Sequence, residues 1–378
     1  MQNTPSFLGE TGFTNLGNTD GLSAVLQCLL NIPHLMQFFL VNDFKREINR
    51  TNVLGYRGDI ATSIGKVLQS YWSGESTVIQ PRDIKTVIGK YAPQFSGFGG
   101  IDFIELLAFL LDAIHEDCNR IMKKPFVELG DLSKLTDKKA STHVWNTHKL
   151  RNDSIITDHF SGQLKATHLC EGCQTETKSF DVINSLNLPI PSLTELNDLR
   201  TSESVLGIKE DTITIYDCLR KFQKPADSSL NDKMYCSKCK GFKNCTHQYQ
   251  IWKLNDILFI RFKRLNLSTR EINKCYIDFE SRLDLSNFVL CENPEMYQYS
   301  LIGVLNYNEN NHYTINLKNI VTQNWVQYND SKTEVMSGFE QAQTKYAHVL
   351  IYQSTASEET FSIDKILPQN LLEKNEKK

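Results

Sequence analysis

The pattern of hydrophobic and polar positions changes along the chain at about residue 160. Before this point, two apolar segments have the spacing of helices, 22–30 (LSAVLQCLL) and 102–117 (DFIELLAFLLDAIHED). The apolar positions of the second segment recur at i, i+3 and i+4, as expected for a helix with one buried face; they are Phe103, Leu106, Leu107, Leu110, Leu111 and Ile114. Turn-forming residues at 15–19 precede the first helix. The N-terminal half is therefore predicted to be mainly helical.

Beyond residue 160 the pattern is that of β-structure. Short runs rich in Thr, Ile, Val, Leu and Tyr predict strands at 162–169, 246–252, 257–262, 300–305, 313–317 and 346–352. Pro, Ser, Asp and Asn predict loops at 189–212 and 224–233. A helical half packed on a β half predicts an α+β fold, with the cleft between the halves as the default site.

Composition limits the class of protein. The 378 residues are 40% hydrophobic and 22% charged, with a net charge of -3. These values are ordinary for a globular protein and argue against a general partner of nucleic acid. No apolar run reaches the ~20 residues of a membrane helix, and the first ten residues lack the features of a secretory signal. We therefore expect no membrane association and an intracellular location, cytoplasmic, nuclear or both.

Four of the ten cysteines form two Cys-x-x-Cys pairs, Cys170/Cys173 and Cys236/Cys239. Gly172 and the Lys240-Gly241 step suit tight knuckles at the two pairs. In a reducing compartment this spacing favours metal ligation over disulfides. The 62 residues between the pairs suit two β-hairpins that meet at one ion. Four thiolates would fill a tetrahedral zinc site, so the zinc is predicted to be structural. The alternative is four unligated thiols.

Several segments together resemble the ubiquitin-specific proteases. The stretch 12–19 (GFTNLGNT) with 26–29 (LQCL) is similar to the nucleophile box, and 95–120 to the second signature helix. Segments 150–173 and 235–264 resemble the zinc-bearing fingers, and 299–319, 325–331 and 346–353 resemble the histidine box and closing strands. The resemblance covers about residues 12–353 in the family's order and is closest to the branch with DUSP and ubiquitin-like modules, neither of which is expected in this chain.

The resemblance implies a papain-like cysteine-protease fold with thumb, palm and zinc-bearing fingers. It divides the chain into an N-terminal lead (1–11), the protease-type domain (12–355) and a charged C-terminal tail (356–378) that is expected to fray. The thumb would span about 12–158, and the fingers and palm about 159–355. The resemblance also implies ubiquitin or ubiquitinated proteins as partners, with the chain itself monomeric or part of a larger complex.

The position at which the family carries its cysteine nucleophile is Asp20 in this chain. A carboxylate is a much poorer nucleophile than a thiolate toward an amide. Cys28 lies roughly 12 Å further along the helix at 1.5 Å per residue, so it cannot replace the missing thiol. The simplest local interpretation of Asp20 is an N-cap of the helix.

Other catalytic positions keep the family's residues. The resemblance implies that Asn15 is the oxyanion-hole asparagine, that His312 is the general base and that Asn329 orients it, with Asp330 as an adjacent acid. Read alone, Asn15 is a turn residue and His312 a packed polar residue. Further departures surround these positions, which is the pattern expected of natural decay of a cleft; they are Gly21, Ser23-Ala24, Gly99–Ile101, Tyr307 and Asn311.

Ubiquitin binding is predicted at the start of the second signature helix. Asp102 and Glu105 match the family's acidic positions and, three residues apart, share one face that could receive arginines of ubiquitin's tail. The alternative is that both acids only complement the helix dipole.

Three functions are compatible with these residues. The leading prediction is a pseudo-deubiquitinase, a catalytically impaired or inactive homologue that acts as a ubiquitin-binding or scaffold module. The first alternative is an active deubiquitinase in which Asp20 and His312 activate water. The second is an interaction protein that no longer binds ubiquitin, which Gly99–Ile101 favours because they replace expected glutamines.

Overall fold

The computed structural model describes residues 8–97, 99–200, 212–227, 233–265, 271–291 and 297–376. The α-helices of this part are α1 (Asp20–Leu30), α2 (Pro33–Met36), α3 (Asp59–Trp72), α4 (Arg82–Tyr91), α5 (Phe103–Asp117), α6 (Asp137–Lys149), α7 (Ile155–His159), α8 (Leu193–Leu199), α9 (Ile215–Gln223), α10 (Phe339–Ala342), α11 (Thr355–Thr360) and α12 (Gln369–Glu376). The strands are β1 (Gly12–Phe13), β2 (Val78–Ile79), β3 (Gly162–Cys170), β4 (Glu176–Ile183), β5 (Ser185–Pro189), β6 (Ile213–Thr214), β7 (Ala226–Asp227), β8 (Met234–Cys236), β9 (Gly241–Lys243), β10 (Cys245–Lys253), β11 (Ile257–Lys263), β12 (Ile277–Asp278), β13 (Arg282–Asp284), β14 (Gln298–Tyr307), β15 (Tyr313–Lys318), β16 (Trp325–Asn329), β17 (Lys332–Val335) and β18 (Ala347–Ser354).

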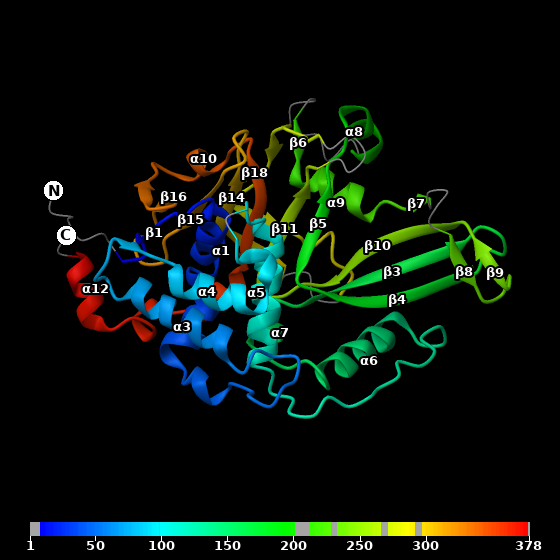
Figure 1. Cartoon of the computed structure of the whole chain (residues 1–378). Coiled ribbons are helices and arrows are strands. Elements are labelled where there is room, and N and C mark those ends of the chain that lie inside the picture. The colour runs from blue at the N-terminus through cyan, green and yellow to red at the C-terminus, as the bar shows by residue number, and fades with distance from the viewer. Residues whose placement is uncertain are drawn as a thin grey trace.

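The central layer is an eight-stranded sheet in the order β17-β16-β15-β14-β18-β11-β5, with β13 paired to β14 (Figure 1). Its pairs are antiparallel except β11 with β5. The inner strands are apolar on both faces, as expected for a sheet covered on both sides. This sheet is the palm.

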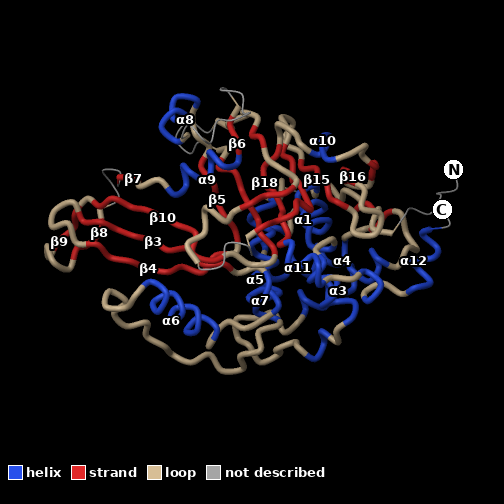
Figure 2. The backbone as a smooth tube through the Cα atoms, turned by 180° about the vertical axis from the view of Figure 1, so that it is seen from behind, coloured by secondary structure: helices blue, strands red, loops and turns tan. Residues whose placement is uncertain are grey.

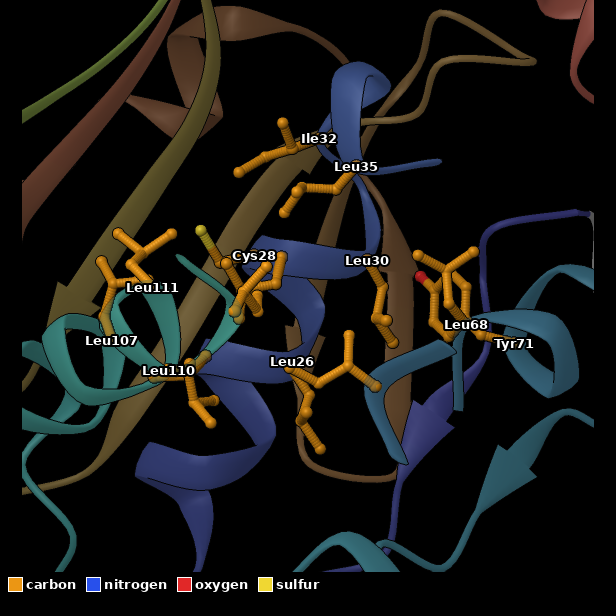
Figure 3. Packing of buried hydrophobic residues seen from close by; sticks show 14 of the residues in the cluster. Leu26, Cys28, Leu30, Ile32, Leu35, Leu68, Tyr71, Leu107, Leu110 and Leu111 are labelled. Carbon is orange, nitrogen blue, oxygen red and sulfur yellow. The ribbon is translucent and has the colours of Figure 1, made fainter. Parts of the chain in front are cut away.

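Helices of the N-terminal half cover one face of the palm and form the thumb (Figure 2). All residues of α1 are buried, since it packs against α5 on one side and β15 on the other. Figure 3 shows Leu26 and Cys28 of α1 among side chains of α3 and α5. Cys28 is 1% exposed and belongs to the thumb core.

A second sheet, in the order β4-β3-β10-β7, extends away from the palm with the β8–β9 hairpin at its far end (Figure 1). Strands β3 and β10 pair along their length, with Cys170 opposite Cys245. These elements are the fingers. The predicted α+β fold with thumb, palm and fingers is confirmed, and the six predicted strands match β3, β10, β11, β14, β15 and β18.

Two predictions about irregular segments are wrong. The segment 189–212, expected as a loop, contains helix α8, which a capping box of Ser192 and Glu195 starts; residues 201–211 lie outside the described part. The tail expected to fray instead forms α11 and α12, and Ile366 and Leu367 are buried in the thumb core. The polar composition of both segments obscures their few buried apolar residues, Leu196 and Leu199 in α8 and Leu372 in α12.

Within the described residues, no single helix is long and apolar enough to cross a membrane. In this part of the chain, one pair of helices, Asp20–Leu30 and Pro33–Val41, passes the test jointly but is bent by 77°.

Candidate functional site

Asp20 lies at the first position of α1, where the thumb meets the palm. Thr19 is the N-cap, so the local interpretation of Asp20 as the cap is wrong. The Asp20 side chain instead crosses to β15, where its Oδ2 accepts the backbone N–H of Tyr313 at 2.7 Å. Asp20 is only 5% exposed, because the palm covers it.

His312, the residue before β15, lies between Asp20 and the end of β16. Its Nδ1 is 3.2 Å from Asp20 Oδ2, and its Nε2 is 2.8 Å from Asn329 Oδ1. The carboxylate of Asp20 can accept a hydrogen bond from a proton-bearing Nδ1, and the amide of Asn329 contacts the opposite nitrogen. The imidazole ring is thus held in orientation between a carboxylate and an amide.

The turn before α1 is tied to Asp330. Asn15 Nδ2 donates to Asp330 Oδ2 at 2.9 Å, and Asn15 Oδ1 accepts the N–H of Gly17 at 3.0 Å and that of Thr19 at 3.1 Å. Asp330 Oδ2 is 4.0 Å from His312 Nε2. A hollow of about 740 Å³ opens beside Asn15. The structure thus brings all five predicted catalytic positions into one cluster; their roles stay predictions.

The sequence predicts that Asn311 and Tyr307 reflect natural decay of the cleft, but in the structure these two residues contact each other. Asn311 has φ 56°, a left-handed conformation that Asn adopts more readily than most residues and that glycine also allows. Its Oδ1 accepts the hydroxyl of Tyr307 at 3.1 Å, and Tyr307 packs on Tyr313 with ring centroids 4.6 Å apart. The two substitutions therefore form one consistent local structure.

Asp102 and Glu105 stand at the start of α5 with exposed side chains. Asp102 is the N-cap, accepting the N–H of Glu105 at 2.9 Å, and its other oxygen accepts the hydroxyl of Tyr313 at 3.2 Å. Asp102 therefore complements the helix and also joins α5 to β15. Tyr313, which the sequence did not single out, contacts both Asp20 and Asp102; its place directly after His312 was the available signal.

Gly21 marks a close approach between α1 and the segment before α5. A Cβ at this position would lie 2.0 Å from the carbonyl oxygen of Ile101. Glycine is therefore required here because of the backbone of residue 101, whatever side chain that residue carries. The carbonyl of Ile101 lies directly on the first turn of α1.

Gly21→Ala should lower the free energy of unfolding by about 1–3 kcal/mol, although alanine is the better helix former, because the rigid backbone at Ile101 must move. Urea titration would measure this change. Gly99→Ala is the matched control: a Cβ there has no atom within 4 Å, so it should change stability by less than about 0.5 kcal/mol. Equal effects of the two substitutions would contradict the close approach.

His348 lies behind Tyr307, with ring centroids 6.1 Å apart. Burial, and then the charges of Arg261 and Arg264, lower its pKa to about 4. The unfolded chain binds this proton near pH 6.5, so the folded state loses stability as the pH falls from 6.5 toward 4. By linkage the loss at pH 5 is about 2 kcal/mol.

His348→Gln should remove this contribution. Between pH 7 and pH 5, urea titrations should show the variant losing about 2 kcal/mol less than the unsubstituted chain. The exposed His143→Gln on α6 serves as the control and should lose as much as the unsubstituted chain. A His348→Gln variant with the unsubstituted pH dependence would show that His348 is not kept neutral by its surroundings.

The four paired cysteines meet at the end of the fingers, as predicted. Cys170 ends β3 and Cys173 lies in the β3–β4 turn, and Cys236 ends β8 and Cys239 lies in the β8–β9 turn. Their sulfur atoms lie within 4.8 Å of one another, with 3.5 Å between Cys173 and Cys236. Tetrahedral ligation at 2.3 Å would need sulfur separations of about 3.8 Å, so the cluster fits a metal ion.

The tight turns at the two cysteine pairs place residues other than the expected glycines in the left-handed conformation. Gln174 and Lys240 have the left-handed φ values of 56° and 53°, whereas Gly172 and Gly241 do not. A hydrogen bond with Thr175 is the main cause that lowers the pKa of Cys173 to about 6. This shift favours the thiolate of Cys173, whereas hydrogen bonds with the neighbouring thiols raise the pKa of Cys239 to about 12. Metal binding requires the thiolate form.

Comparisons with known proteins define the class. A helical thumb, a palm sheet and a four-cysteine finger tip around one polar cluster are the features of a papain-like protease hand. The family model "Ubiquitin carboxyl-terminal hydrolase" matches residues 11–352. The chain belongs to this family.

Individual relatives agree with this assignment. Human ubiquitin carboxyl-terminal hydrolase 15 is 43% identical over 206 residues, 54% of this chain and 20% of that protein. Bovine ubiquitin carboxyl-terminal hydrolase 4 is 44% identical over 183 residues, 48% of this chain and 19% of that protein. The matched stretch is thus about a fifth of these relatives.

Among solved structures, the SAGA DUB module of Ubp8, Sgf11, Sus1 and Sgf73 bound to monoubiquitin contains a chain with the same fold. The TM-score is 0.65 at 20% identity, with 93% of this chain and 71% of that chain covered.

Proposed function

We propose that this chain is a pseudo-deubiquitinase, which binds ubiquitin or ubiquitinated proteins without cleaving them. The observation that carries the proposal is Asp20, a carboxylate at the start of α1 and 3.2 Å from His312. In the family's nucleophile box this position belongs to the attacking thiol. Asp20 preserves the charge pattern of a thiolate–imidazolium pair, and so keeps the cleft folded, but lacks the sulfur.

The chemistry of Asp20 supports loss of hydrolysis. Attack by a carboxylate on an amide would form a mixed anhydride, a high-energy intermediate, whereas a thiolate forms a thioester. The carboxylate is also occupied, since it accepts the Tyr313 N–H at 2.7 Å. Cys28 cannot replace it, because burial strongly raises the pKa of its thiol.

The active alternative, water activated by Asp20 and His312, has less support. Aspartic proteases use two carboxylates that share one proton. In this chain Asp20 contacts Nδ1 of His312, and Asp330 approaches Nε2. The two acids are therefore separated by the imidazole ring, and each is engaged by another donor.

Ubiquitin binding is supported by the exposed Asp102 and Glu105, which can accept arginine side chains from a basic peptide tail. The approach of Ile101 to Gly21 favours the other alternative, an interaction protein that does not bind ubiquitin, since it narrows the space beside α1. We further infer a structural zinc at the four cysteines, an intracellular location, and descent from the branch with DUSP and ubiquitin-like modules.

The test separates binding from turnover. The chain should bind immobilised ubiquitin chains and leave a ubiquitin–fluorophore amide uncleaved. If the chain cleaved the substrate and Asp20→Ala abolished that cleavage, the active deubiquitinase would replace this proposal. Absence of both binding and turnover would favour the interaction protein.

A charge-matched substitution sharpens the binding test. Asp20 should repel the free C-terminal carboxylate of ubiquitin, so calorimetry should give about tenfold tighter binding of C-terminally amidated ubiquitin. Asp20→Asn keeps an oxygen for the Tyr313 N–H but removes the charge, and should equalise the two affinities. If the unsubstituted chain bound free and C-terminally amidated ubiquitin with identical affinities, the ubiquitin tail would not lie beside Asp20 as proposed.

A further inference from the structure

Three side chains that could bind a metal converge on the seam between thumb and palm, far from the cysteines. They are His34 on α2, His159 at the end of α7 and Asp256 in the turn between β10 and β11. Each offers one ligand atom, and the three atoms lie within 4.8 Å of one another. Because these residues come from segments remote in sequence, only the fold brings them together.

The distances suit a small site. Asp256 Oδ2 is 2.6 Å from His159 Nδ1 and 3.8 Å from His34 Nε2, and the two imidazole rings have centroids 4.2 Å apart. Tetrahedral ligation with bonds of about 2.1 Å needs ligand atoms about 3.4 Å apart. A modest rotation of His159 away from Asp256 would therefore admit an ion.

The burial and contacts of His34 decide which of its two nitrogens could bind an ion. The side chain of His34 is only 10% exposed, and its Nδ1 is buried without a hydrogen-bond partner among the described residues. Its Nε2 lies 2.8 Å from Ser357 Oγ on α11. The nitrogen that faces Asp256 and could bind an ion is therefore Nε2, which an ion would share with or take from the Ser357 hydroxyl. An ion on Nε2 would leave Nδ1 as it is, so Nδ1 gives no separate support for the site.

The surroundings hold the three side chains in place. Asn255 Nδ2 donates to the carbonyl of Asp158 at 2.6 Å, which fixes the β10–β11 turn against the end of α7. The carbonyl of Asp256 accepts the N–H of Ser354 at 2.7 Å. Site residues fixed by such neighbours lose little entropy when a metal binds.

We propose that His34, His159 and Asp256 form a second metal site, which binds Zn²⁺ or a similar divalent transition ion and joins the thumb to the palm. Two imidazoles and one carboxylate are ligands that suit zinc, and three protein ligands leave a fourth position for water. Asp256 and His159 are about one-third exposed, at 32% and 30%, so that position opens to solvent. The site is independent of the proposed ubiquitin function: α2 follows the C-terminal end of α1, about 16 Å from Asp20 at 1.5 Å per residue.

Zinc titration of the full chain tests the site. After one equivalent of Zn²⁺ has filled the cysteine cluster, calorimetry should detect a second equivalent, and its binding should raise the Tm by at least about 2 °C. His159→Gln and Asp256→Asn each remove one ligand, so each should weaken the second equivalent by at least about 100-fold, more than loss of an outer-shell partner costs.

The control is His143→Gln, which removes an exposed histidine on α6 and should leave both equivalents intact. Because two ligand variants are used, a folding defect in one does not hide the result; circular dichroism identifies it. Absence of a second equivalent in the unsubstituted chain, or a second equivalent that survives both ligand variants, would overturn the proposal.

Discussion

Asp20→Cys should give the chain a reactive thiolate and detectable cleavage of a ubiquitin–fluorophore amide. The sulfur would stand at the N-terminus of α1 beside His312 Nδ1, where Asp20 Oδ2 is now 3.2 Å away. Both the helix dipole and an imidazolium stabilise a thiolate, so the pKa of the new thiol should fall well below the ordinary value of about 8.5. A positioned base contributes about 10²–10⁴-fold to such reactions, and we expect turnover to rise at least about 100-fold above the unsubstituted chain.

Two measurements distinguish the parts of this prediction. The pH dependence of alkylation by iodoacetamide reports the thiolate alone, and turnover of the ubiquitin substrate also requires the tail to enter beside Gly21 and Ile101. Asp20→Ser is the control for size and hydrogen bonding, since a serine should remain inactive. Adding His312→Ala should return the alkylation profile toward that of a free thiol. If the pH dependence of alkylation in Asp20→Cys were that of an ordinary free thiol, His312 would not stabilise a thiolate at position 20.

Loss of the cysteine cluster should have the largest effect on stability. Apparent binding free energies for structural zinc in small domains are about 10–16 kcal/mol, and that energy is coupled to folding. The β8–β9 hairpin has strands of three residues each and cannot be stable alone. Cys173→Ser, or removal of metal by a chelator, should therefore lower the Tm by at least about 5 °C.

Cobalt substitution identifies which site is lost. Thiolate-to-cobalt absorption should require Cys173 and should persist in the control Cys245→Ser, which removes a buried thiol of the same fingers outside the cluster. A Cys173→Ser variant that keeps both the absorption and the Tm would show that the four thiols are unligated.

The departures at the cleft differ in kind. Asn311 and Tyr307 accommodate each other, since the tyrosine hydroxyl donates to the asparagine, whereas Gly21 accommodates the backbone of residue 101 whatever side chain stands there. On the proposed function, Asp20 provides another anion at the position of a thiolate, and it accepts the Tyr313 N–H. Under that proposal, a cleft without its nucleophile but with intact packing is what selection for binding, rather than for turnover, would leave.

Much of the fold follows from local patterns in the sequence. The i, i+3, i+4 spacing of 102–117 predicts α5 because side-chain periodicity and helix geometry are both properties of neighbouring residues. The strands that border the cleft and the two Cys-x-x-Cys turns could be predicted for the same reason, because their patterns also involve only neighbouring residues. Helix α8 was missed because a single capping box within polar residues is a weak signal.

The sequence by itself therefore determined the fold class and the four-cysteine cluster, and it predicted the residues of the catalytic positions. The tertiary structure alone decided that Asp20 accepts the N–H of Tyr313, that Ile101 lies against Gly21, and that His34 and His159 lie beside Asp256. The physical reason is that periodicity, capping and turn chemistry act over a few residues. Contacts between α1 and β15, or between α2 and the β10–β11 turn, instead join residues more than 200 positions apart, whose meeting depends on how all the intervening elements pack.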